Sequence, residues 1–269
     1  MLTRQIQYLR PDQILAIIQE KPIAYWPLGL VEWHGPHLPF GVDAFNAEAV
    51  AIRAANEGGG LVFPTTYLGT EREREPQLLD WLGFTDDNWI VGMDFPANAL
   101  PSMYAREDIF AITVRENLRL MAGYGLDLIV IISGHAATNQ LETLWRIAAE
   151  FNAAHDTQVL VVLPFVANEE GLMEVGHASR IETSIMMALQ PETVKLDNLP
   201  PTTEPLNNPD WGIIDYFTFA GQPTAERIVH DEDDPRRGTA EAGEEMLRRA
   251  AKQILDRVDD LLAGQAQKV

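Results

Sequence analysis

Apolar, β-branched runs alternate with amphipathic segments along most of this chain. Such alternation is typical of repeated strand–helix units, which build a parallel sheet covered by helices. The predicted strands are residues 23–28, 61–64, 126–132 and 159–165. The predicted helices are residues 43–55, 109–123, 139–154, 179–189 and 239–262. The pattern therefore predicts an α/β fold with a mainly parallel central sheet.

Two segments do not follow this alternation. Residues 71–105 carry several large aromatic side chains at irregular spacing, and residues 190–234 carry many prolines and the aromatic stretch 211–219. Long irregular segments in a domain are often lids or binding loops, and contacts between subunits are an equally good interpretation. The length of 269 residues fits one domain that spans residues 1–269.

Charge and composition exclude several classes of partner and site. The formal net charge of -20 argues against binding to nucleic acid or to an anionic membrane, because phosphate groups are bound by clustered Lys and Arg. The chain has no cysteine, so a metal site must use His, Asp and Glu. The apolar runs are too short to cross a bilayer, and residues 1–10 lack the apolar core of a signal peptide. We therefore expect a cytoplasmic protein.

Histidines and carboxylates follow the predicted strands. In an open parallel sheet, ligands bind beyond the carboxyl ends of the strands. The loop after the first strand contains Glu32, His34, His37 and Asp43 among glycines and prolines. His135 follows the strand 126–132, and the segment after the next strand contains His177 and Glu182. These side chains are therefore expected at one edge of the sheet.

Each of these residues also has a purely structural interpretation. Asp43 is well placed to be the N-cap of the helix that it precedes. Ser179 and Glu182 match a capping box, and a single His at a strand end is more often structural than a ligand. His155 and His230 are expected on the surface. Four histidines and several carboxylates are nevertheless expected to converge on one sheet edge, and this donor set suits Zn, Mn or Fe.

The same residues resemble the creatininase family, which comprises creatinine amidohydrolases and their relatives. The family carries a Leu-Gly-x-x-Glu-x-His-Gly-Pro-His-Leu-Pro-x-x-Thr/Val-Asp motif, a Gly-His-x-x-Asn loop and a His-Ala-x-x-x-Glu-Thr-Ser segment. These correspond here to residues 28–43, 134–139 and 177–184. A weaker match, residues 234–243, resembles the turn before the family's last helix. The resemblance covers residues 22–262 and implies a three-layer α/β/α fold.

The resemblance also implies a site for two divalent ions. Its metal ligands would be Glu32, His34, Asp43, His135 and Glu182, with Asp43 bridging both ions. His177 would be the catalytic acid/base residue, and His37, Trp33 and Asn139 would bind substrate or support the ligands. Creatininase itself has a Glu two residues after the His of its Gly-His loop, where this chain has Ala137, so the last carboxylate is assigned to Glu182.

The implied reaction is hydrolysis by a metal-held hydroxide that cleaves a C–N bond in a small cyclic amide or formamide. Ring-opening C–C cleavage of a cyclic diketone requires the same chemistry and is an alternative, as are a non-catalytic metal- or ligand-binding protein and a structural subunit. Trp33 and the segment 71–98 depart from the family pattern, so creatinine is not the expected substrate. The resemblance further implies a homo-oligomer, with a hexamer as the family's form.

Overall fold

The sheet that the alternating pattern predicts is present in the computed structural model, which describes residues 3–81, 84, 89–95, 98, 100–167, 176–204, 206, 229 and 231–266. Within these residues its strands are β1 (Ile23–Gly29), β2 (Leu61–Val62), β3 (Thr66–Tyr67), β4 (Leu128–Ser133) and β5 (Gln158–Val162). The order is β2-β1-β4-β5, with β3 also paired to β1, and every pairing is parallel.

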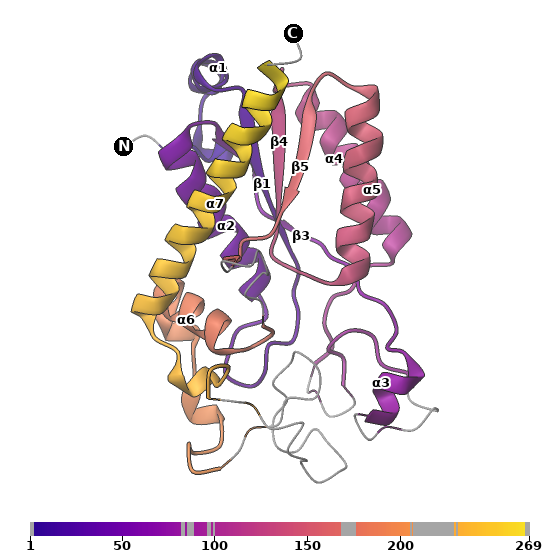
Figure 1. Cartoon of the computed structure of the whole chain (residues 1–269), viewed down its shortest axis with the longest axis vertical. Helices are drawn as coiled ribbons and strands as arrows, with labels where there is room; N and C mark the ends of the chain where they lie inside the picture. Colours follow the sequence, from indigo (N-terminus) through magenta and orange to yellow (C-terminus); the bar gives the residue numbers. More distant parts are fainter. Residues whose placement is uncertain are drawn as a thin grey trace.

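Helices cover both faces of this sheet (Figure 1). The α-helices are α1 (Pro11–Glu20), α2 (Val42–Gly58), α3 (Pro76–Trp81), α4 (Glu107–Ala122), α5 (Thr138–Ala154), α6 (Arg180–Leu189) and α7 (Ala240–Ala266). Short 3-10 helices lie at Ile6–Tyr8, Pro191–Thr193, Leu196–Asn198 and Pro235–Arg237.

Alternate side chains of β1 separate two apolar cores, because successive side chains of a strand point to opposite faces. Ile23 and Tyr25 pack with residues of α2, α6 and α7. Ala24, Trp26 and Leu28 pack with residues of α4 and α5 on the other face. The three-layer α/β/α fold is thereby confirmed.

The predicted elements are recovered with small shifts at their ends. The strand expected at 126–132 begins at Leu128, and the strand expected at 159–165 ends at Val162, one residue before the Leu163-Pro164 pair. The helices α1 and α3 and the strand β3 were not predicted. Most of the segment 71–105 is irregular as expected, whereas the stretch 211–219 and His230 lie outside the described residues.

The chain leaves β1 toward β2 on one side and later enters β4 on the other side of β1. This change of direction opens a crevice beyond the carboxyl ends of β1 and β4, the place where open α/β sheets bind ligands. In the part of the chain that the structure describes, no helix has the length and apolar character needed to span a membrane.

One close helix contact completes the layer around α2. Helix α7 packs against both α6 and α2. A Cβ atom on Gly243 of α7 would overlap the backbone of Ser184 in α6, so only glycine allows the two helices to approach this closely. Gly264, near the end of the same helix, faces open space.

Candidate metal centre

The ends of β1 and β4 bring their loops together. Leu28 pairs with Ser133 at the end of the shared register, and the Gly134 amide donates to the Leu28 carbonyl at 2.7 Å. The loops that follow therefore enter the same crevice. They carry Glu32 and His34 on one side and His135 on the other, and all three side chains are buried.

Asp43 reaches this crevice from the first turn of α2. The helix begins at Val42 and its N-cap is Gly41, so the interpretation of Asp43 as an N-cap is wrong. A Cβ atom on Gly29 would overlap the backbone of Ala44, and one on Gly134 would overlap the backbone of Asp43. These two glycines let the first turn of α2 sit against both strand ends, which holds the buried Asp43 carboxylate between the loops.

Asp43 belongs to two groups of closely spaced donor atoms. In the first group, His135 Nδ1 lies 3.2 Å from Glu32 Oε2 and 3.4 Å from Asp43 Oδ2. In the second, His34 Nε2 lies 3.3 Å from Asp43 Oδ1 and 3.7 Å from Glu182 Oε2. Within each group the donor atoms lie within 4.8 Å of one another. The two oxygens of Asp43 thus face different groups.

Glu182 contacts the start of its own helix and also faces the donor group of His34. Ser179 is the N-cap of α6, and its hydroxyl accepts from the Ile181 amide rather than from that of Glu182. The Glu182 carboxylate accepts from the Ala178 amide at 2.6 Å while facing His34. Neither hydrogen bond of a capping box is therefore present, and that prediction is wrong, although Glu182 does fold back onto the start of the helix. Ala178 has a φ of 51°, a left-handed conformation that is uncommon for a residue with a Cβ.

The donor set fits a pair of divalent cations. The His34 Nδ1–H donates to the Glu32 carbonyl at 3.0 Å, so Nε2 faces Asp43 and would bind a metal ion through its lone pair when the ring is neutral. His34 Nε2 and Asp43 Oδ2 are buried and make no hydrogen bond with the described residues. Buried polar atoms without hydrogen-bond partners destabilise the folded state. Imidazole nitrogens and carboxylate oxygens are ligands for Zn, Mn and Fe, so bound ions would supply the missing partners.

The charges of the centre depend strongly on one another. Burial alone would lower the pKa of each ligand histidine, but the surrounding carboxylates raise the pKa of His34 and of His135 well above the usual range. Burial would raise the pKa of Asp43, yet the facing side chains of His135 and His34 hold it well below the usual range. The carboxylates thus require positive charge beside them, which bound cations would supply.

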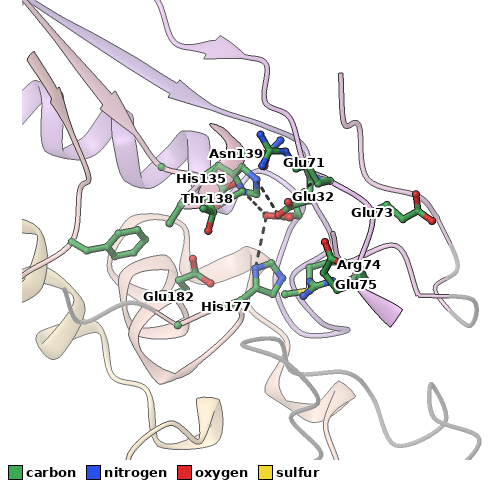
Figure 2. A pocket seen from close by; sticks show the side chains of 18 residues that line it. Glu32, Glu71, Glu73, Arg74, Glu75, His135, Thr138, Asn139, His177 and Glu182 are labelled. Carbon is green, nitrogen blue, oxygen red and sulfur yellow. Dashed lines mark hydrogen bonds and ion pairs between the residues drawn. The ribbon is translucent and has the colours of Figure 1, made fainter. Parts of the chain in front are cut away.

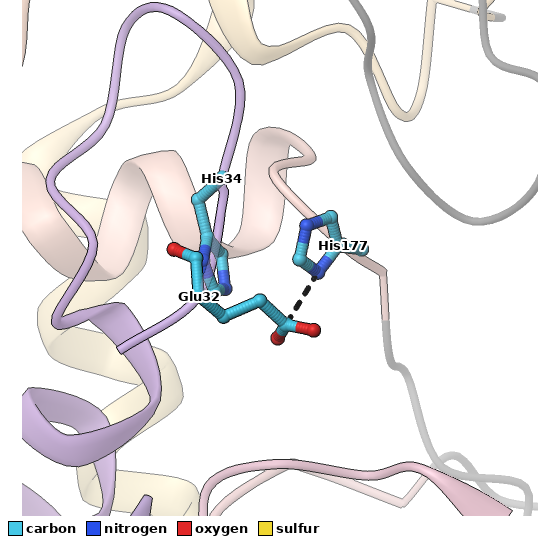
Figure 3. A group of neighbouring side chains, drawn as sticks. All are labelled: Glu32, His34 and His177. Atoms are coloured by element: carbon cyan, nitrogen blue, oxygen red, sulfur yellow. Dashed lines mark hydrogen bonds and ion pairs between the residues drawn. The ribbon is translucent and has the colours of Figure 1, made fainter. Parts of the chain in front are cut away.

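His177 lies beside both groups, next to Glu32 and His34 (Figure 3). Its Nε2 is 2.5 Å from the Trp33 carbonyl. A carbonyl only accepts, so Nε2 carries the hydrogen and the neutral ring has its lone pair on Nδ1. Nδ1 lies 3.8 Å from Glu32 Oε2. Burial and the neighbouring His34 lower the pKa of His177, which favours this neutral form. His177, Glu32 and His34 form a third group of possible ligands.

His37, Trp33 and Asn139 were expected to bind substrate or support the ligands, and each lies in a different environment. His37 is buried, and its Nε2 is 3.1 Å from Thr183 Oγ1 on α6. Burial lowers the pKa of His37 to about 3, and His37 is in none of the ligand groups. It therefore supports α6 beneath the site.

Trp33 contributes its backbone to the site and its indole to an apolar cluster. Its carbonyl holds His177, and its ring packs edge-on against Phe40 with ring centroids 6.0 Å apart. The indole also packs against a cluster that consists of Leu79, Ile90, Met93 and Phe95. Trp33 is absent from the lining of the main cavity, so the structure favours packing over substrate contact.

A cavity of about 660 Å³ opens beside the donor groups (Figure 2). Its lining includes Asn139 and Thr138 at the start of α5 and the charged run Glu71 to Glu75. Asn139 follows His135 by four positions, one more than the family motif allows, so Thr138 stands where the motif has Asn. The charged side chains of the lining are Glu32, Asp43, Glu71, Arg72, Glu73, Arg74, Glu75 and Glu182, with His135 and His177 beside them.

Supporting residues were missed by the sequence analysis. The buried Gln140 side chain donates to Ser133 Oγ at 3.0 Å and accepts from the Thr70 amide at 2.9 Å, which ties the His135 loop to the chain before Glu71. Tyr104 donates to Glu32. Burial and the Glu32 carboxylate raise the pKa of this phenol well above the usual range. The contacts of Thr70 with Gln140 and of Glu32 with Tyr104 join residues 70 or more positions apart, so no local sequence pattern predicts them.

Comparison with known proteins identifies the family of this chain. The family model described as "Creatininase: Creatinine amidohydrolase" matches residues 7–258. The chain belongs to the creatininase family. It is thus a metal-dependent hydrolase of the amidohydrolase type, as the sequence motifs predicted.

Individual creatininases are distant in sequence but similar in fold. A creatinine amidohydrolase of Pseudomonas putida is 27% identical over 198 residues, which cover 66% of this chain and 70% of the relative. A crystal structure of creatininase superposes with a TM-score of 0.67 at 22% identity, covering 97% of this chain and 98% of that one. Another neighbour, a mutant creatininase of Zn-Zn type, gives 0.67 at 23% identity over 97% and 98% of the two chains.

Proposed function

We propose that this creatininase-family enzyme cleaves the C–N bond of a small cyclic amide or formamide with the help of two divalent ions. The observation that carries the proposal is Asp43, whose two carboxylate oxygens face two separate donor groups. Carboxylates commonly bridge paired ions in this way. Creatininase structures are described as Zn-Zn and Mn forms, and the same donor set also suits Fe.

The proposed ligands divide between two ion positions. Glu32, Asp43 and His135 would hold one ion, and His34, Asp43 and Glu182 would hold the other. Ions at such positions acidify water near neutral pH and polarise a carbonyl group. The surrounding chain fixes the ligands: the Glu32 carbonyl orients His34, and the Ala178 amide orients Glu182.

His177 moves the proton in the proposed reaction. Its Nε2–H is held by the Trp33 carbonyl, so Nδ1 accepts the proton that the attacking water loses. The same nitrogen then delivers the proton to the leaving nitrogen of the substrate. An imidazole suits this exchange because it changes charge near neutral pH.

The substrate is proposed to be small and either uncharged or cationic. The cavity of about 660 Å³ suits a small molecule. Its lining carries six carboxylates against the two guanidinium groups of Arg72 and Arg74. Bound cations would neutralise part of this charge at the metal end, where Glu71 Oε2 also lies 3.9 Å from His135 Nε2.

Metal analysis followed by a substrate screen tests the proposal. Protein purified without chelator should contain close to two equivalents of Zn, Mn or Fe, or take them up on addition. The loaded enzyme should hydrolyse at least one compound in a panel of lactams, formamides and cyclic diketones. Asp43→Asn is the inactive control.

Each outcome of that test separates the alternatives. Absence of any bound or acquired transition metal would contradict the proposal. If only the cyclic diketones are turned over, the enzyme cleaves C–C bonds and the proposed C–N hydrolysis is wrong. Tight binding of metal without turnover of any compound would indicate a binding protein.

We also infer that the chain works in the cytoplasm as a homo-oligomer, with a hexamer as the form that the family resemblance implies. The support is a set of exposed apolar side chains on the outer helices. Ile112 is the most exposed of these on α4, and Trp145 is the one on α5. Surfaces of this kind commonly mark protein contacts.

A further inference from the structure

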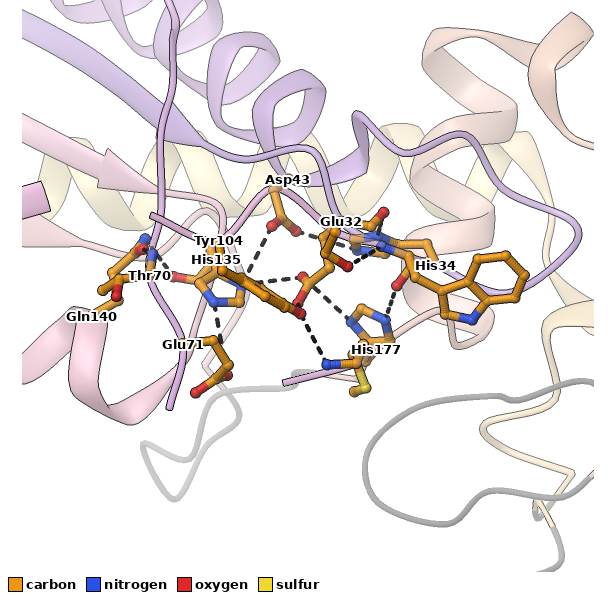
Figure 4. Close-up of polar contacts among 12 residues, drawn as sticks. Glu32, His34, Asp43, Thr70, Glu71, Tyr104, His135, Gln140 and His177 are labelled. Carbon is orange, nitrogen blue, oxygen red and sulfur yellow. Dashed lines mark hydrogen bonds and ion pairs between the residues drawn. The ribbon is translucent and has the colours of Figure 1, made fainter. Parts of the chain in front are cut away.

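Residues 102–105 run alongside the loop that carries Glu32. The Met103 amide donates to the Val31 carbonyl at 2.8 Å. The Ser102 hydroxyl accepts from the Trp33 amide at 3.0 Å. Between these two contacts, the Tyr104 hydroxyl donates a short hydrogen bond to Glu32 Oε1 (Figure 4). The residue on each side of Glu32 is thus fixed by backbone contacts, and its carboxylate is fixed by a phenol.

The two carboxylate oxygens of Glu32 have different surroundings. Oε1 accepts from Tyr104. Oε2 faces His135 Nδ1 at 3.2 Å and His177 Nδ1 at 3.8 Å. Only Oε2 therefore points toward the donor group that Glu32 shares with Asp43 and His135. The direction of the Tyr104 hydrogen bond decides which oxygen is free to bind an ion.

The Tyr104 hydroxyl is itself held in one orientation. The Met93 amide donates to it at 2.9 Å, so the phenolic hydrogen is left to point at Glu32. Met93 is part of a turn that contains Gly92, whose φ is 53°. A Cβ atom on Gly92 would overlap the Tyr104 hydroxyl. Gly92 is therefore required both by the turn and by the space that Tyr104 occupies.

We propose that Tyr104 is a positioning residue that restricts Glu32 to one ligand oxygen and thereby sets the metal affinity of the Glu32–Asp43–His135 position alone. The inference rests on the two-ion site proposed above. Tyr104 makes no contact with the donor atoms of His34 or Glu182, so the second position has no direct dependence on it. Residues that orient a metal ligand typically contribute a factor of about 10–100 in affinity.

Metal binding by Tyr104→Phe tests this directly. The metal-free chain and the variant are titrated with Mn²⁺ and with Zn²⁺, and the affinities of the two positions are measured by calorimetry and equilibrium dialysis. We expect one position to weaken by about 10- to 100-fold and the other to stay unchanged. Gly92→Ala, which displaces the same hydroxyl, should weaken the same position.

Two controls separate positioning from a general structural effect. Tyr25→Phe removes another buried hydroxyl, one with no hydrogen-bond partner in the described part of the chain, and should leave both affinities unchanged. Glu32→Gln identifies the position that Glu32 serves. In the double variant Tyr104→Phe/Glu32→Gln, the tyrosine change should not lower the metal affinity further. Tyr104 is proposed to act only through Glu32, and the effects of such coupled residues do not add.

Failure of this inference is distinguishable from failure of the proposed function. If the parent chain binds two ions and Tyr104→Phe leaves both affinities unchanged, the positioning role is overturned and the two-ion site stands. Equal weakening of both positions, or a full effect of Tyr104→Phe on top of Glu32→Gln, overturns it as well. A parent chain that binds no ion overturns the proposed function itself.

Discussion

Asp43 is the second residue of α2, and its two oxygens face different neighbours. Replacement by Asn keeps the size of the side chain and removes its charge and one acceptor. Asp43→Asn should therefore lose both ions, whereas Glu32→Gln and Glu182→Gln should each weaken one. Elemental analysis of the purified variants measures this. Asp12→Asn, a change at an exposed carboxylate, is the control. Two ions retained in Asp43→Asn would contradict the bridging role.

His177 is expected to act on protons rather than to hold an ion. His177→Asn should keep nearly normal metal content while kcat falls by on the order of a hundredfold or more, the usual scale of general acid–base help. Metal content and kcat are compared for the parent and the variant, with His155→Asn as a surface control. Parallel loss of metal and turnover would make His177 a ligand, as its place in a group with Glu32 and His34 also allows.

At the residue scale, the sequence predicted the reactive groups better than their supports. Glu32, His34, Asp43, His135 and Glu182 converge as expected because parallel strands end at one edge of a sheet. Tyr104 and Gln140 were not anticipated. Each acts through a hydrogen bond to a residue 70 or more positions away, and neither periodicity nor strand-end position carries that information.

Elements with strong periodicity were predictable, and those held by tertiary contacts were not. The strands β1 and β4 are buried along their whole length, which gives the continuous apolar runs typical of a parallel sheet. The helix α3 has only six residues and β3 only two. Such short elements are stabilised by their surroundings rather than by local sequence.

The contact between α6 and α7 allows a matched test at this scale. Gly243→Ala should destabilise the fold by about 1–3 kcal/mol, the usual cost of overpacking, because the added methyl group overlaps the Ser184 backbone. Gly264→Ala, in open space on the same helix, should be neutral or stabilising by up to about 1 kcal/mol. Denaturant unfolding of both variants measures the difference. Equal effects would contradict the close approach of the helices.

The molecule as a whole should assemble. Ile109, Ile112 and Leu120 are 50–63% exposed along one side of α4, opposite the side that packs on the sheet. Light scattering at micromolar concentration should give a mass several times the 30.0 kDa of one chain. Ile112→Glu should lower that mass if the stripe lies in a contact. A parent chain of single-chain mass would refute the assembly, and an unchanged mass for Ile112→Glu would place the contact elsewhere.

The sequence analysis also expected aromatic segments at subunit contacts or over the mouth of the site. Trp89 is 75% exposed, which is compatible with either place. The stretch 211–219 lies outside the described residues, and its position stays a prediction.

The proposed ligands are spread along the chain, and this fixes when the centre can form in a cell. Glu32, His34 and Asp43 leave the ribosome before the other ligands, and Glu182 follows Glu32 by 150 residues. At about 5–20 residues per second, that delay is on the order of ten seconds or more. Helix α7, which covers α2 and so supports Asp43, is synthesised after all of the proposed ligands. A nascent chain therefore carries carboxylates and imidazoles that cannot yet discriminate among cellular cations. Selection of the ion therefore requires a folded centre, and it depends on the metals available at that moment.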